Sequence, residues 1–68
     1  MSDNVYKLVE VVGTSSESFS AAADTAVRKA SGTLHNLDWF EVCEMRGRIT
    51  DGGIAEYQVP LKVGFRLD

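Results

Sequence analysis

Apolar and polar residues alternate most regularly near the C-terminus. Between Ile54 and Leu67 every second position is apolar over the run Tyr57, Val59, Leu61, Val63, Phe65 and Leu67. Successive side chains of a strand point to opposite faces, so this segment is predicted to be a strand with one wholly apolar face. Pro60 lies within it. Because proline lacks a backbone N–H, its nitrogen is expected to face an edge, a bulge or a gap.

Two further strands are indicated by β-branched and apolar residues. Residues 5–12 read VYKLVEVV and form the first, which Gly13 is expected to end. The second is predicted from Trp39 to Ile49. The turn residues Asp51, Gly52 and Gly53 follow directly, so this strand and the C-terminal one are expected to form a hairpin.

The segment between these strands has the periodicity of an amphipathic helix. Apolar residues recur every three or four positions: Phe19, Ala22, Ala23, Ala26, Val27, Ala30 and Leu34. A helix is predicted from Ser16 to Gly32, with the hydroxyls of residues 14–16 as candidate N-caps. Asp24 and Arg28 form a favourable i,i+4 pair on its polar side.

The element order β-α-β-β predicts an α+β fold in two layers. A three-stranded antiparallel sheet, in the order 1-3-2, would pack on one helix, with residues 1–68 forming a single domain. The helix would span about 25 Å. The last strand would reach about 45 Å if straight. One helix cannot cover such a sheet, so the uncovered apolar surface is expected to meet other copies of the chain.

Composition supports the expectation of an assembly. The chain has 68 residues with one cysteine, so neither an internal disulfide nor a Cys/His zinc site is available to stabilise it. A net charge of −3 with scattered basic residues excludes general binding to nucleic-acid polymers. The sequence offers no membrane-spanning run and no signal peptide, and a lone thiol is typical of the cytoplasm, where we expect the protein.

Composition and spacing predict neither an enzyme nor a metal site. Four carboxylates fall on predicted strands, but no nucleophile or metal pattern accompanies Glu10, Glu41, Glu44 and Glu56. His35 is expected to be a solvated loop residue, and Cys43 a small packing residue.

Three residues around the predicted hairpin could bind a flat, polar-edged ligand. Trp39 offers an electron-rich aromatic face, and Gln58 a donor and an acceptor for an imide or amide edge. Arg46 could neutralise a phosphate. The alternative interpretation makes Trp39 a packing residue and the other two solvated surface residues. Spacing alone favours that alternative.

The sequence resembles the dodecins, a family of small flavin-binding proteins, over nearly its whole length. The matching segments are VYKLVEVVGTSSESF, LDWFEV with the following E-M-R-G stretch, and EYQVPLKVGFRLD. The resemblance implies the β-α-β-β fold and a hollow homododecamer. It also implies that flavins bind in pairs, stacked between tryptophans, and that a glutamine hydrogen-bonds to the pyrimidine edge of each flavin ring.

Carried onto this chain, the resemblance makes Trp39 the stacking residue and Gln58 the edge-reading residue. It places Arg46 as the candidate for a flavin phosphate, and Tyr6 and Lys7 on a strand that borders the pocket.

The implied function is storage and photoprotective sequestration of FMN in the cytoplasm, without catalysis. Riboflavin or FAD are alternative flavins, and coenzyme A is a possible second ligand. Two other functions stay open: a flavin-dependent redox enzyme and a purely structural oligomeric module.

Overall fold

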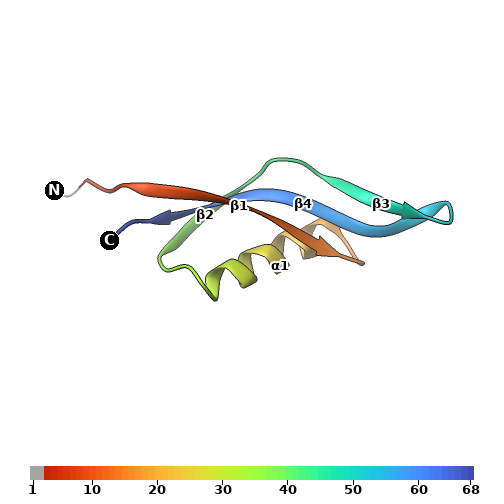
Figure 1. Ribbon diagram of the computed structural model, residues 1–68, viewed down its shortest axis with the longest axis horizontal. Coiled ribbons are helices and arrows are strands. Elements are labelled where there is room, and N and C mark those ends of the chain that lie inside the picture. Colours follow the sequence, from red (N-terminus) through yellow and green to blue (C-terminus); the bar gives the residue numbers. More distant parts are fainter. Residues whose placement is uncertain (1–2) are drawn as a thin grey trace.

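The computed structural model describes residues 3–68, which form one helix against one face of a four-stranded antiparallel sheet (Figure 1). The elements are β1 (Tyr6–Ser15), α1 (Phe19–Ser31), β2 (Leu37–Val42), β3 (Arg46–Thr50) and β4 (Gly53–Arg66). The strand order is β1-β4-β2, and β3 also pairs with β4. The α+β class and the central position of the C-terminal strand are thus confirmed.

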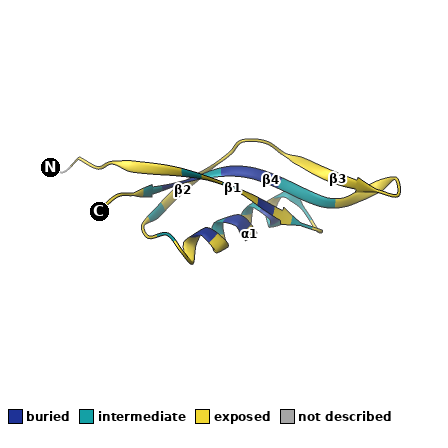
Figure 2. Ribbon diagram, in the orientation of Figure 1, coloured by how far each residue is buried: buried dark blue, intermediate teal, exposed yellow. Residues whose placement is uncertain are grey.

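The core lies where β4 faces the helix. Val59, Leu61 and Val63 of β4 are buried, and so are three alanines of α1: Ala22, Ala26 and Ala30. In Figure 2 these buried segments face each other across the two layers. Small alanine side chains let the helix axis approach the sheet closely, so larger β4 side chains fill the space between them.

Gly13 does not end the first strand, contrary to expectation. β1 continues to Ser15, and Gly13 pairs with Val59 in the ladder. A side chain at position 13 would overlap the Ala22 carbonyl and lie 2.8 Å from the Ala26 Cβ. Glycine is therefore present because the helix backbone packs directly on the strand here.

The predicted second strand, residues 39–49, is wrong as a single element, because it is divided into β2 and β3. The break is opposite Pro60, whose carbonyl accepts bonds from the N–H groups of Cys43 at 2.9 Å and Glu44 at 3.4 Å. Two residues thus oppose one, as in a β-bulge. The nitrogen and oxygen of a strand residue point to the same side, so the Pro60 nitrogen also faces this bulge, as predicted.

The helix begins later than predicted. Ser18, not the hydroxyls of residues 14–16, is the N-cap: its side chain accepts the Ala21 N–H at 3.0 Å. Gly32 is the C-cap, as expected. The expected pair is present too, with Arg28 Nε 2.7 Å from an Asp24 carboxylate oxygen. Within residues 3–68 no helix combines the length and apolar character needed to cross a membrane.

The β3–β4 hairpin projects beyond the helix (Figure 1). Its turn uses left-handed backbone at Asp51 (φ 53°) and Gly52 (φ 79°), the type I′ geometry that suits a two-residue connection. The described chain measures 56 × 20 × 13 Å, whereas α1 spans only about 20 Å. Ile49 and Ile54 near the tip are 74% and 63% exposed. The predicted uncovered apolar surface is therefore present.

Candidate ligand-binding face

The predicted site residues lie mainly on the sheet face turned away from α1, which we call the outer face. Odd-numbered β4 residues such as Leu61 face the helix, so even-numbered ones face outward. Residues paired across an antiparallel ladder share a face. Three pairs therefore place their side chains on the outer face: Tyr6 with Arg66, Trp39 with Gly64, and Arg46 with Gln58.

A register shift in β2 turns Trp39 outward. In a regular strand Leu37 and Trp39, two residues apart, would share a face. The shift between them pairs Leu37 with Phe65 and Trp39 with Gly64, adjacent residues of β4 that point to opposite faces. Leu37 consequently packs against the core, while Trp39 lies on the outer face.

The indole of Trp39 lies flat on Gly64. A Cβ built at position 64 would be 2.5 Å from Cε2 and Cζ2 and 2.7 Å from Cδ2 of the indole. Cε2 and Cδ2 are the fusion carbons of the bicycle, so an atom close to both lies over the ring face and not at its rim. One face of the indole is therefore covered by β4 backbone, a contact that only glycine permits.

Two side chains hold the indole in this position. The Tyr6 ring packs nearly perpendicular to it, with centroids 5.1 Å apart and an interplanar angle of 68°. The indole Nε1–H donates a hydrogen bond to Glu41 Oε2 at 3.0 Å. Trp39 is still 38% exposed, so an aromatic surface of fixed orientation is accessible on the outer face. We call Tyr6, Trp39, Glu41 and Gly64 the tryptophan cluster.

Gln58 is held between a cation and an anion. Its Oε1 accepts from Arg46 Nε at 2.9 Å, and its Nε2 donates to Glu56 Oε1 at 2.8 Å. The two opposite charges fix which end of the carboxamide is oxygen and which is nitrogen. One N–H and one oxygen lone pair remain for a ligand edge.

Arg46 belongs to the same charged group on the hairpin. Its Nη1 donates to Glu44 Oε1 at 3.0 Å, and the side chain is 49% exposed. Arg48 Nε lies 3.6 Å from Oε1 of Glu56, the same oxygen that accepts the hydrogen bond from the Gln58 amide. The two Arg46 bonds use Nε and Nη1, so Nη2 is left for an anionic ligand. We call Glu44, Arg46, Arg48, Glu56 and Gln58 the glutamine cluster.

The two clusters are separate within one chain. Trp39 pairs with position 64 of β4 and Gln58 occupies position 58, which places about 20 Å of strand between them. The structure brings Tyr6 to Trp39 and Arg46 to Gln58, but it does not bring Trp39 to Gln58. Lys7 pairs with Phe65 and so lies on the helix side of the sheet, not with Tyr6 on the outer face.

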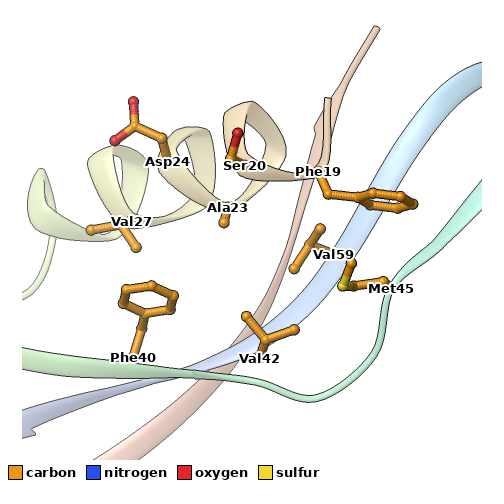
Figure 3. Close-up of a pocket in the computed structure, with 9 residues that line it drawn as sticks. All are labelled: Phe19, Ser20, Ala23, Asp24, Val27, Phe40, Val42, Met45 and Val59. Carbon is orange, nitrogen blue, oxygen red and sulfur yellow. The ribbon is translucent and has the colours of Figure 1, made fainter. Parts of the chain in front are cut away.

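An apolar groove on the helix side contains neither Trp39 nor Gln58. It lies between α1 and the β2–β3 edge, with a volume of about 510 Å³. Figure 3 shows Phe19 and Val27 on the helix side facing Phe40, Val42 and Met45 on the strand side. Phe40 and Met45 are 52% and 59% exposed. This groove adds to the uncovered apolar surface at the hairpin tip.

Comparison with known proteins identifies the family. The family model described as Dodecin matches residues 5–68. The chain belongs to the dodecin family. It is 58% identical over 64 residues to a dodecin of Thermus thermophilus, and the match covers 94% of this chain and 93% of that one.

Two other dodecins, one about as similar in sequence as the Thermus protein and one less similar, share the fold. The dodecin of Streptomyces davaonensis superimposes with a TM-score of 0.95 at 54% identity, covering 98% of both chains. The calcium dodecin of Mycobacterium tuberculosis is 30% identical over 64 residues, covering 94% of this chain and 90% of that one. Its structure, described as calcium-chelating, has a TM-score of 0.83. In the present chain, residues 3–68 contain no group of three or more His, Cys, Asp or Glu side chains that could hold a metal ion.

Sequence reasoning did not assign a role to three residues that shape these clusters. From the sequence, Glu41 and Glu56 are identified only as carboxylates without a catalytic partner, and Gly64 is assigned no role. Glu41 follows Trp39 by two residues and Glu56 precedes Gln58 by two. Residues two apart on a strand share a face, so this spacing is the signal that could have identified both carboxylates.

Proposed function

We propose that this dodecin binds and stores FMN without turnover, in a homododecamer in which paired flavin rings stack between Trp39 side chains. The observation that carries the proposal is the indole of Trp39, which lies flat on Gly64 and is held there by Tyr6 and Glu41. Such a fixed aromatic plane suits a flat tricyclic ligand, because little side-chain entropy is lost when the ligand stacks on it.

Stacking would supply part of the affinity. An aromatic pair contributes about 0.5–1.5 kcal/mol beyond the burial of its area. The described protein side chains that contact the indole leave 38% of Trp39 exposed, which is surface that a flavin ring could cover. Gly64 supports the stack from behind, since no side chain there pushes the indole outward.

Gln58 suits the polar edge of the flavin ring. The pyrimidine part of the ring presents an imide, which needs one donor and one acceptor side by side. The bonds to Arg46 and Glu56 leave Gln58 with one N–H and one lone pair in a fixed polarity. Each hydrogen bond would contribute about 0.5–1.5 kcal/mol net.

The separation of the two clusters supports a site shared between copies. A flavin ring stacked on Trp39 is shorter than the roughly 20 Å of strand that separates position 64 from position 58. The Gln58 that reads the ring edge would therefore belong to another copy of the chain. The apolar groove and the hairpin tip offer surfaces for assembly, because apolar patches of this kind are rarely left open in monomers.

Arg46 is the candidate partner of the FMN phosphate. Its Nη2 is free of the two bonds described, and a charge-assisted contact to phosphate is stronger than a neutral one. This contact would favour FMN over riboflavin. FAD as the flavin and coenzyme A as a second ligand follow from the family resemblance alone.

Storage is favoured over catalysis by the stacking itself. A ring covered by an indole on one side and by a second flavin on the other is closed to a substrate. An indole in contact can also donate an electron to the light-excited flavin and so quench its emission, which would limit photochemistry.

The experiment is a titration of purified apoprotein with FMN, followed by absorption and by flavin emission, with the mass measured by light scattering. We expect saturable uptake, strongly quenched emission, and a mass twelvefold that of the 7.4 kDa chain. A protein that takes up no flavin would support the structural module instead. Steady turnover of NAD(P)H by the holoprotein would support the redox enzyme.

A further inference from the structure

A carboxylate is bonded to the one polar atom of the indole. Glu41 Oε2 lies 3.0 Å from Trp39 Nε1, and the two residues share the outer face because they are two apart on β2. The chain contains a single tryptophan. This bond therefore bears on the only indole that could stack on a flavin.

We propose that Glu41 is a positioning residue that orients the Trp39 indole and, through its negative charge, makes that indole a better electron donor. The second half of this inference rests on the proposed flavin-binding function; the first half does not.

The orienting role follows from the number of contacts. Gly64 covers one face of the indole but would allow it to slide, and the near-perpendicular Tyr6 ring touches it from one direction. A hydrogen bond from Nε1 is directional, and an ionised acceptor makes it stronger than a neutral one. The Glu41 bond is thus the contact that selects one rotation of the ring on Gly64.

The charge of Glu41 matters when the indole is oxidised. The indole of Trp39 gives one electron to the light-excited flavin, and the oxidised indole becomes far more acidic at Nε1. Its proton passes to Oε2 of Glu41 along the existing hydrogen bond. When the electron returns, the proton returns to Nε1, so no bond is permanently changed. The flavin is the only oxidant, and the cycle consumes no further reactant.

A neighbouring carboxylate provides a matched control. Glu41 pairs with Lys62 of β4, and Glu10 of β1 pairs with the same lysine from the other side. Both acids lie on the outer face, but only Glu41 bonds Trp39. Glu10→Gln removes the same charge beside the same lysine and leaves the indole bond intact.

The first measurement needs no flavin. In the ¹⁵N–¹H NMR spectrum of the assembled apoprotein, the single indole N–H gives one resonance. We expect Glu41→Ala to move this resonance upfield and to speed its exchange with water about tenfold, as expected for loss of a charge-assisted bond. Glu41→Gln keeps an acceptor oxygen and should give an intermediate shift. Glu10→Gln should leave the resonance unchanged.

The second measurement uses the FMN-loaded protein. We expect Glu41→Gln to bind FMN but to show brighter flavin emission than Glu10→Gln, because its amide cannot accept the indole proton. An indole resonance that is the same in wild type, Glu41→Ala and Glu10→Gln would overturn the orienting role. Equal emission from Glu41→Gln and Glu10→Gln would overturn the electronic role. A wild type that binds no FMN would refute the proposed function and the electronic role together, while the apoprotein spectrum would still decide the orienting role.

Discussion

Trp39 and Gln58 share the outer face of the sheet, yet β4 keeps them about 20 Å apart. Neither side chain is free to close the gap. The indole is held over Gly64 by Tyr6 and Glu41, and the carboxamide is held by Arg46 and Glu56. In the proposed function each chain would therefore carry two half-sites, one for a ring face and one for a ring edge.

Subunits that each lack one half-site should restore binding when they are mixed. Neither Trp39→Ala nor Gln58→Ala alone contains a complete site. After co-refolding of the two variants, some sites would combine an intact Trp39 from one chain with an intact Gln58 from another. We expect FMN affinity and quenching close to wild type in that fraction, measured by titration at matched protein concentration.

In the control, each variant is refolded separately, and the two assembled proteins are then mixed without unfolding, so that no assembly contains both variants. If the co-refolded mixture binds FMN no better than this control, Trp39 and Gln58 act within one chain, and the hypothesis of a site shared between copies is wrong.

A methyl group at position 64 should displace the indole. A Cβ there would lie 2.5 Å from the Trp39 ring, so Gly64→Ala forces the indole off the sheet. We expect a loss of about 1–3 kcal/mol in unfolding free energy and at least tenfold weaker FMN binding. Gly53→Ala on the same strand is the control, since its nearest atom is 4.0 Å away. Equal FMN affinity in the two variants would contradict the face-on contact.

Arg46 should distinguish FMN from riboflavin. Arg46→Ala removes the proposed phosphate contact and also the bond that orients Gln58. We therefore expect FMN affinity to fall by about tenfold or more, and riboflavin affinity to fall less. Arg48→Ala is the control, because Arg48 approaches Glu56 without a bond to Gln58. If Arg46→Ala leaves the FMN-to-riboflavin affinity ratio unchanged, Arg46 orients Gln58 and does not bind phosphate.

Helix packing should depend on Gly13. An alanine there would overlap the Ala22 carbonyl, so Gly13→Ala must push α1 away from β1. We expect a loss of about 1–3 kcal/mol in unfolding free energy, seen as a lower midpoint in urea at fixed protein concentration. Stability equal to that of wild type would show that the helix can shift at no cost.

Much of the fold could be predicted from local pattern. The alternation between Ile54 and Leu67 defines β4 and its core face, and the Asp51–Gly52 turn defines the hairpin. The errors arose where a distant segment decides the outcome. Gly13 continues a strand because α1 packs on it, and the break between β2 and β3 depends on Pro60, across the ladder. Pattern within a segment does not contain these contacts.

The sequence predicts candidate site residues, but not how one chain arranges them. The register shift at Leu37 and Trp39 reverses the face that simple alternation assigns to the tryptophan. The hairpin predicted from Trp39 to Leu67 also does not contain the bulge at Cys43 and Glu44, which lets two short strands share one long partner. The resemblance to dodecins indicates Trp39 and Gln58 as site residues, and the strand register shows how far apart the two lie within one chain.

The central claim is that the indole of Trp39 stacks on the flavin, and the emission of bound FMN tests it most directly. Trp39→Ala should bind FMN at least tenfold more weakly and leave the bound flavin bright, because both the stacking surface and the electron donor are lost. Gln58→Ala should also bind more weakly, by the loss of edge hydrogen bonds, but its bound flavin should stay dark. Trp39→Ala protein that binds FMN as tightly as wild type, with equally quenched emission, would contradict the account.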